Sequence, residues 1–242
     1  MTAHERLEAT LATLSAKPGD SATRREKKRY SEQMSEIVAQ VIASELRELG
    51  MTEARPAPPG QVGASGAERR IAGGIGAKKV DVTWATEESG LLLALSVKTT
   101  NFKDNRSQNY QKNLTNRRGE MLFETVTLHR RFPYAVIGGL YILDAGAGED
   151  GTARRESTFL NAHTAFKLFT NRLDPGDREE KFEAFYLALQ RSTPFKSEIQ
   201  LYHAGEPEKA STLDDMLKRL LELVVERNSD LYQLLDGRMV KK

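Results

Sequence analysis

"KVDVTWATEESGLLLALSVKT", residues 79–99, is the stretch of sequence that decides the fold. Residues 79–86 alternate valine, threonine and tryptophan with other side chains, which is typical of a β-strand. A turn sequence, Glu-Glu-Ser-Gly, follows, and residues 91–99 then form an apolar run long enough to lie centrally in a sheet. The sequence therefore predicts a hairpin whose second strand is buried.

Helical spacing of apolar side chains flanks this hairpin on both sides. Intervals of three and four residues predict a helix over residues 21–49 before it and another over residues 115–132 after it. Residues 133–144 are apolar almost throughout, which is typical of a strand buried on both faces. We therefore expect an α/β (α+β) fold, a mixed central sheet with flanking helices, built on the order helix-strand-strand-helix-strand. Further elements are expected at residues 2–15, 157–172 and 211–228 as helices, and at residues 181–190 and 196–204 as added strands.

The composition excludes several kinds of site. The 242 residues contain no cysteine, which removes disulfides, thiolate metal centres and a cysteine nucleophile, and which suits a reducing cytoplasm. The formal net charge is only +2, so any surface for nucleic acid must be local. The glycine-rich residues 73–79 lack the Gly-Lys-Ser/Thr of a phosphate loop. We expect a cytoplasmic protein with no nucleotide cofactor and, because no stretch approaches about 18 apolar residues, no membrane contact.

Three polar side chains of the hairpin can carry chemistry. Asp81 lies between two valines and points to the opposite face from them, while Ser96 and Lys98 share one face of the second strand. Neighbouring strands lie about 5 Å apart, so Asp81 can meet Ser96 or Lys98 if the register allows it. A carboxylate that binds a hard cation beside an ammonium that orients a water suits metal-assisted hydrolysis of a phosphodiester. The alternative is a solvated aspartate and a lysine that merely ends an edge strand.

The order of these residues and elements resembles the PD-(D/E)XK nuclease superfamily. The resemblance covers roughly residues 30–145: Asp81, the hairpin, Ser96-Val97-Lys98, a helix and a buried strand. It implies an aspartate and a second acid that bind Mg²⁺, with Mn²⁺ as a substitute, and a lysine that assists the attacking water. Val80 stands where the superfamily commonly has proline, and Ser96 stands where it has the second acid. A subset of restriction endonucleases with Ser-x-Lys takes the missing carboxylate from the following helix.

Several glutamates are candidates for that missing carboxylate. Glu120 ranks first, because residues 117–120, "RRGE", are similar to the Arg-x-x-Glu of this subset. Glu124 lies one turn further along the same predicted helix. Glu45 and Glu68 precede the hairpin, and such enzymes often add a glutamate from the helix in that position.

A basic stretch, residues 98–118, follows the candidate lysine. Cations suit phosphate contacts, and amides suit base edges and the sugar–phosphate backbone. Phe102 and Tyr110 either stack on bases or anchor the loop, and an ordinary solvated loop is the alternative for the whole stretch. The residues expected to contact DNA are Lys103, Arg106, Lys112, Asn116 and Arg117.

The sequence is therefore interpreted as that of a Mg²⁺-dependent DNA endonuclease. A double-strand cutter needs two active sites, so a homodimer is expected. The alternative is a non-catalytic nucleic-acid-binding protein on a degenerate nuclease scaffold, for which Ser96 is the main argument. Four segments are expected: N-terminal helices in 1–50 that pack on the core or dimerise it, a Pro/Gly linker in 51–66, a nuclease-like core in 67–205, and a C-terminal amphipathic helix in 206–242.

Overall fold

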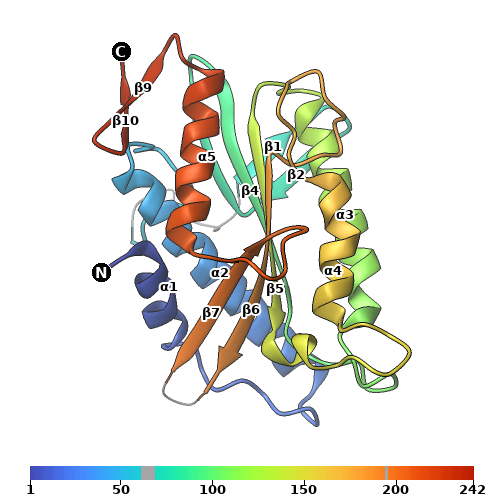
Figure 1. The fold of residues 1–242 in the computed structure, drawn as a ribbon. Coiled ribbons are helices and arrows are strands. Elements are labelled where there is room, and N and C mark those ends of the chain that lie inside the picture. The colour runs from blue at the N-terminus through green and yellow to red at the C-terminus, as the bar shows by residue number, and fades with distance from the viewer. Residues whose placement is uncertain (61–68, 194–195) are drawn as a thin grey trace.

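A six-stranded mixed sheet forms the centre of the molecule (Figure 1). The computed structural model describes residues 1–60, 69–193 and 196–242. The strands lie in the order β3-β4-β5-β6-β7-β8; β4, β5 and β6 run parallel, and the other neighbours are antiparallel. Their bounds are β3 Val82–Thr86, β4 Gly90–Thr100, β5 Val136–Asp144, β6 Ala184–Ser192, β7 Ser197–His203 and β8 Ala210–Ser211.

Helices cover both faces of this sheet, so the expected mixed α/β architecture is confirmed. Three helices pack on one face, α1 (Ala3–Leu11), α2 (Arg24–Glu48) and α5 (Leu213–Arg227), and two on the other, α3 (Leu114–His129) and α4 (Thr158–Phe166) (Figure 1). Short 3₁₀ turns at Gln111–Asn113, Ala145–Gly148 and Lys167–Phe169 adjoin α3, β5 and α4. The ends of the chain, α1, α2 and α5, therefore share one hydrophobic core with the sheet.

Strand β4 is the buried second strand of the predicted hairpin. Its side chains alternate between the two cores: Leu93 and Leu95 join the core under α2 and α5, whereas Ala94 joins the core under α3 and α4. The partner strand β5 passes close by, because a side chain at Gly138 would place its Cβ 2.6 Å from the side chain of Leu95. The apolar runs in the sequence thus give strands that are covered on both faces.

The first strand of the hairpin is shorter than the sequence predicts. Instead of one strand over residues 79–86, the chain forms β2 (Ala77–Val80), bends at Asp81, and continues as β3. Strand β2 pairs with β1 (Arg69–Ala72) in a separate two-stranded sheet, and the turn between them donates a backbone hydrogen bond from Gly74 to α3. The pairing of β3 with β4 stops where Val82, the first residue of β3, lies opposite Leu95. From Ser96 onward, β4 therefore has no β3 residue beside it.

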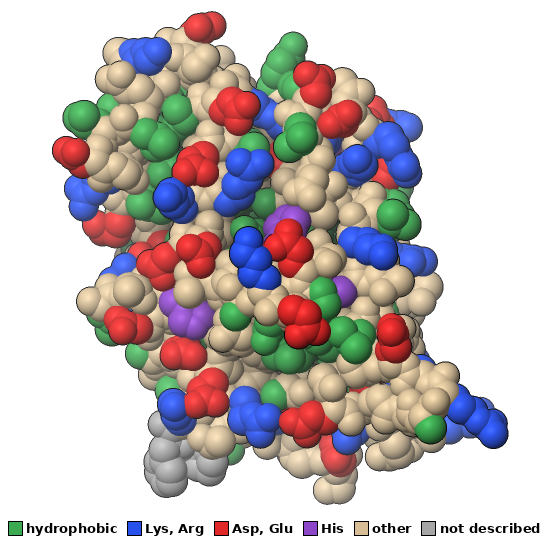
Figure 2. Space-filling view, in the orientation of Figure 1, with side chains coloured by type: hydrophobic (Ala, Val, Ile, Leu, Met, Phe, Trp, Pro, Cys, Tyr) green, Lys and Arg blue, Asp and Glu red, His purple; other side chains and the backbone are tan. Residues whose placement is uncertain are grey.

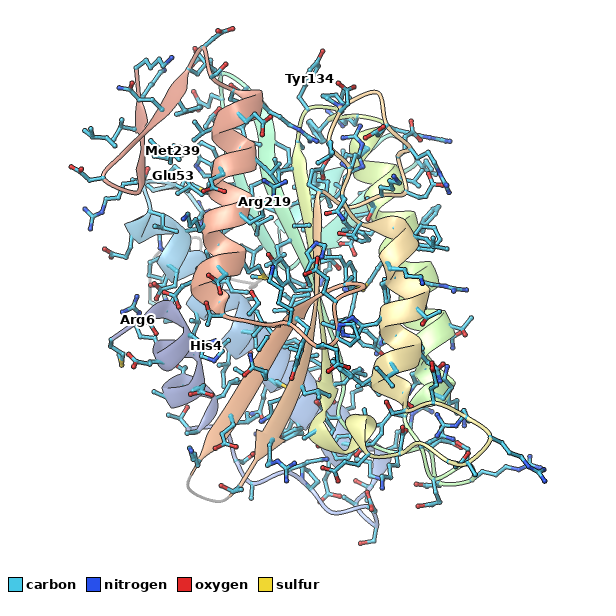
Figure 3. The ribbon with its side chains drawn as sticks, in the orientation of Figure 1. His4, Arg6, Glu53, Tyr134, Arg219 and Met239 are labelled. Carbon is cyan, nitrogen blue, oxygen red and sulfur yellow. The ribbon has the colours of Figure 1, made fainter. Side chains whose placement is uncertain are left out.

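Residues 51–60 of the expected linker are packed against the sheet. Met51 and Ala54 are buried, and Arg55 exchanges two backbone hydrogen bonds with Thr83 on the outer side of β3. At the other end of the chain, a hairpin of β9 (Tyr232–Leu235) and β10 (Arg238–Lys241) follows α5. Met239 of this hairpin donates a backbone hydrogen bond to Leu49, where α2 ends (Figure 3). None of the helices in the described ranges carries an apolar stretch long enough to cross a membrane.

A buried ion network holds α3, β5, β6 and α5 together. Glu183 accepts hydrogen bonds from Arg172 (2.8 Å), Arg227 (2.6 Å) and the backbone of Ile137 (2.6 Å), and His129 lies 3.2 Å away. Burial opposes the ionisation of Glu183, but the hydrogen bond and charge of His129 and the charges of the two arginines outweigh it and lower its pKa. The network joins the end of α3 to the start of β5 and β6.

Candidate active site

Asp81 and Lys98 come together at the bend before β3, where β4 continues past the first residue of β3. The carboxylate Oδ2 of Asp81 accepts a hydrogen bond from the backbone N–H of Val97 at 2.6 Å, and Nζ of Lys98 lies 3.5 Å from the same oxygen. The hydrogen bond to Asp81 satisfies the backbone N–H of Val97, in the part of β4 that has no β3 residue beside it. Asp81 therefore contacts the second strand of the hairpin at Val97 and Lys98, and its contact with Lys98 was one of the two expected from the sequence.

The second carboxylate beside Lys98 belongs to Glu124. Its Oε2 accepts a hydrogen bond from the hydroxyl of Ser96 at 2.9 Å and lies 3.9 Å from Nζ of Lys98. Lys98 thus stands between an acid at the bend and an acid on α3, with its own side chain 21% exposed. Ser96, which replaces the acid expected on the strand, orients the carboxylate that comes from the helix.

Glu120, which the sequence ranked first, does not reach this place. It lies one helical turn, about 5.4 Å along the axis, before Glu124. Its carboxylate is 53% exposed and pairs with Arg117 at 2.7 Å. The Arg-x-x-Glu spacing therefore describes a surface ion pair on α3, and Glu124 takes the position next to Lys98.

The two candidate glutamates that precede the hairpin, Glu45 and Glu68, are not found beside Lys98 in the described structure. Glu45 is buried on α2 and pairs with Arg6 of α1, and Figure 3 shows Arg6 on the side of the sheet opposite α3. This pairing explains the acid on the apolar face of the helix, because a buried charge needs a partner. Glu68 falls outside the described ranges.

The electrostatic state of Glu124 is set by its surroundings. Burial raises its pKa above the ordinary range of a carboxyl, the nearby Lys98 ammonium opposes this, and the negative charge of Asp81 adds to it. The residue is only 5% exposed, and its Oε1 has no hydrogen-bond partner in the structure. An orphaned carboxylate oxygen in this position is available to a ligand that offers positive charge.

A cleft of about 790 Å³ opens over Asp81 and Lys98, while Ser96 and Glu124 are buried behind its lining. Helix α2 forms one wall, and β2, the end of β4 and the start of α3 form the rest. The described lining residues include six cations and three acids; the full set is Arg24, Lys27, Lys28, Ser31, Glu32, Ser35, Glu36, Ala39, Lys79, Asp81, Val97, Lys98, Thr99, Asn113 and Arg117.

Sequence reasoning missed the contribution of α2 to this cleft. Glu32 and Glu36 are acids of the helix before the hairpin, and they line the cleft, whereas Glu45 does not. Their signal in the sequence was the polar face of α2, where Arg24, Lys28, Glu32 and Glu36 recur every four residues. The apolar face of α2 predicts the helix and packs in the core, whereas its polar face lines the cleft.

The residues expected to contact DNA fall into two groups. Arg117 lines the cleft, and Asn113 beside it does so too. Lys112 instead pairs with Asp104 on the surface, Arg106 and Asn116 are exposed, and the ammonium of Lys103 lies 6.0 Å from the ring centre of Tyr110. The middle of the basic stretch thus forms a surface loop next to the cleft.

The two aromatic residues of the basic stretch anchor this loop. Tyr110 is buried, and its hydroxyl donates a hydrogen bond of 2.6 Å to Asp144. Phe102 packs edge-on against Tyr30 of α2, with 5.8 Å between ring centres. Of the two alternatives for these rings, the structure supports anchoring.

The carboxylates fit a hard divalent cation that keeps much of its water. Within residues 1–60, 69–193 and 196–242, no group of three His, Cys, Asp or Glu side chains is arranged to hold a metal by itself. Mg²⁺ commonly binds through only one or two carboxylates, with water and substrate phosphate as its other ligands. Asp81 and Glu124, with its orphaned Oε1, offer such a donor set.

Comparison of the chain with protein-family models, with curated proteins and with solved structures found no match. The function is therefore argued from the residues of the cleft themselves.

Proposed function

We propose that the protein is a Mg²⁺-dependent DNA endonuclease that hydrolyses phosphodiester bonds. The observation that carries the proposal is Lys98, held between Asp81 and Glu124 at a cleft whose walls carry a surplus of cations. Acids, an ammonium and a basic surround are the groups that phosphodiester hydrolysis requires. The resemblance to PD-(D/E)XK nucleases supports the same reaction.

Each residue has a role that follows from its contacts. Asp81 and Glu124 would hold Mg²⁺, with Mn²⁺ as a substitute, and the metal would supply Lewis-acid stabilisation of the phosphate charge. The Lys98 ammonium would orient the attacking water and stabilise the developing negative charge. Ser96 keeps the Glu124 carboxylate in place through its hydroxyl.

We also propose an oligomeric state and a cellular location for the enzyme. A break in both strands of a duplex needs two such sites, so we propose a homodimer. A chain without cysteine suits the reducing cytoplasm, where we propose that the enzyme works. Molar mass from light scattering, measured with and without a DNA duplex, tests the homodimer.

Plasmid cleavage with four purified proteins tests the activity. The wild type should cut with Mg²⁺ and not with EDTA. Lys98→Ala and Glu124→Gln should each lose at least about 100-fold in rate, as expected when a group that moves protons or charge in the transition state is removed. Glu120→Gln is the matched control on the same helix, and it should cut like the wild type.

The outcome of this assay separates the proposal from its rival. Equal loss in Glu120→Gln and Glu124→Gln would contradict the assignment of the second acid. If no protein cuts with Mg²⁺ or Mn²⁺ but all bind DNA with a steep salt dependence, the chain is a nucleic-acid-binding protein on a degenerate nuclease scaffold.

A further inference from the structure

The cleft-lining face of α2 divides by charge along its length. Its first two turns present Arg24, Lys27 and Lys28 to the cleft, and the next turns present Glu32 and Glu36. From Arg24 to Ala39 this face is about 20 Å long, at 1.5 Å per residue. The three cations therefore lie at the start of α2, and the two acids lie on the turns that follow.

A second set of cations lies on the other walls of the cleft. Lys79 of β2 and Arg117 of α3 complete the lining there, with Asp81 and Lys98 between them and α2. Positive side chains thus stand on more than one side of the candidate catalytic residues. By contrast, the face over α4, α5, β6 and β7 in Figure 2 intersperses lysine and arginine with aspartate and glutamate.

The cations at the start of α2 are held in place or open to solvent. The Lys27 ammonium lies 5.5 Å from the ring centre of Phe102 and donates a hydrogen bond of 2.6 Å to the backbone of Asp20. Arg24 is exposed, and Lys28 pairs with Glu32 at 3.5 Å with both side chains more than 60% exposed. Such a surface pair is weak, so Lys28 can exchange this partner for a phosphate.

The lining offers charge without stacking. Among the described residues that line the cleft there is no phenylalanine, tyrosine or tryptophan. Proteins that hold single strands by their bases rely on aromatic platforms, whereas backbone recognition relies on cations. The cations that line the cleft therefore suit contacts to successive phosphates of a nucleic-acid backbone, and such contacts do not depend on the base sequence.

We propose that the first two turns of α2 form a phosphate-binding track, Arg24, Lys27 and Lys28, which positions the sugar–phosphate backbone of DNA leading into the cleft. This inference rests on the proposed function, because it names how that substrate is held. The track supplies affinity and register, and sequence selection has to come from elsewhere on the protein.

Two double variants of the same helix test the track. Arg24→Ala/Lys28→Ala removes two cations of the track. Arg25→Ala/Arg29→Ala removes two exposed cations outside the cleft lining, at neighbouring positions in the same turns. Both variants have the same net charge, so long-range electrostatics is matched. Fluorescence anisotropy then measures the affinity of each for two labelled 20-base-pair duplexes of unrelated sequence, in EDTA, from 50 to 200 mM KCl.

The expected result is a difference in salt dependence. Each lost phosphate contact lowers the slope of log K against log salt by about 0.9, so the track variant should lose about 1.8. Over this fourfold rise in salt, wild-type binding should weaken roughly 10-fold more than binding by the track variant. Both duplexes should be affected equally, and the control should keep the wild-type slope.

Equal slopes for the track and control variants would overturn the proposal, as would a loss confined to one duplex. Plasmid cleavage by the wild type reports separately on the proposed function. Cutting without a slope difference would leave the nuclease standing and remove the track. A slope difference without cutting would keep the track and remove the catalytic reading.

Discussion

Replacement of Lys98 by methionine measures how much the ammonium contributes to the free energy of unfolding by compensating the charges of two nearby acids. Its Nζ lies 3.5 Å from Asp81 and 3.9 Å from Glu124. At an effective dielectric constant of about 20, each contact corresponds to an attraction of about 4–5 kcal/mol before desolvation is subtracted. Breaking a buried pair typically costs about 3–5 kcal/mol. Since Lys98 is partly exposed and Glu124 can take up a proton, we expect a loss of about 2 kcal/mol in the free energy of unfolding.

Thermal unfolding in EDTA, followed by circular dichroism, checks this expectation. For a chain of this size, about 2 kcal/mol corresponds to a fall in Tm of roughly 4–8 °C. Lys112→Met is the control, because its pair with Asp104 is on the surface and should contribute little to stability.

Divalent cations should then rescue the Lys98→Met variant. A Mg²⁺ or Mn²⁺ ion at Asp81 and Glu124 would supply the charge that the ammonium supplied, so 10 mM of either should raise the Tm of the variant more than that of the wild type. An unchanged Tm in EDTA would refute the view that Lys98 compensates the two acids. The same rise in both proteins would refute the view that a metal ion at Asp81 and Glu124 can supply the positive charge lost with the Lys98 ammonium.

Three further changes probe the site and its support. Burial raises the pKa of Glu124 in the folded state, so its ionisation should reduce stability as pH rises above the ordinary carboxyl pKa of about 4.3. Glu124→Gln should therefore have a higher Tm than the wild type at pH 8 and nearly the same Tm at pH 4. A gain in Tm that is independent of pH would contradict this. The pKa of Glu183 is lowered in the folded state, so its ionised form should stabilise the fold fully above the unfolded carboxyl pKa of about 4.3, and this contribution should fall as pH drops toward the folded pKa. Glu183→Gln should cost about 3 kcal/mol at pH 7 in urea unfolding and less at pH 3. Gly139→Ala would force a methyl group to within 2.4 Å of a buried ring and should cost about 1–3 kcal/mol, whereas Gly119→Ala, which meets nothing within 4 Å, should be neutral or stabilising in the same titration.

The elements of the fold could be predicted from the sequence because their signals are local. The apolar runs that became β4 and β5 and the three-four spacing of α2, α3 and α5 each place one buried face. The break at Asp81 could not be predicted in this way. It depends on β1, which pairs with β2 and draws the chain away from β4. This pairing joins residues five to eleven positions apart, and no local pattern fixes its register.

The second acid of the site shows the same limit in one helix. Glu120 and Glu124 are one turn apart, so helical periodicity treats them alike. They differ only in depth: Glu124 faces Ser96 and Lys98 on the sheet, and Glu120 lies one turn toward the end of α3 that meets solvent. A sequence motif could rank them, but only the packing of α3 on β4 decides between them.

Asp81 shows why the fold and the candidate site cannot be separated here. A strand that outruns its partner leaves backbone donors unpaired, and a buried N–H without a partner is costly. The Asp81 carboxylate satisfies the N–H of Val97 with one oxygen and lies 3.5 Å from the Lys98 ammonium through that same oxygen. The bend at Asp81, which leads the chain away from β4, therefore does two things at once. It opens the cleft, and it fixes an acid in that opening by a backbone contact, so that the acid is positioned before any ligand arrives.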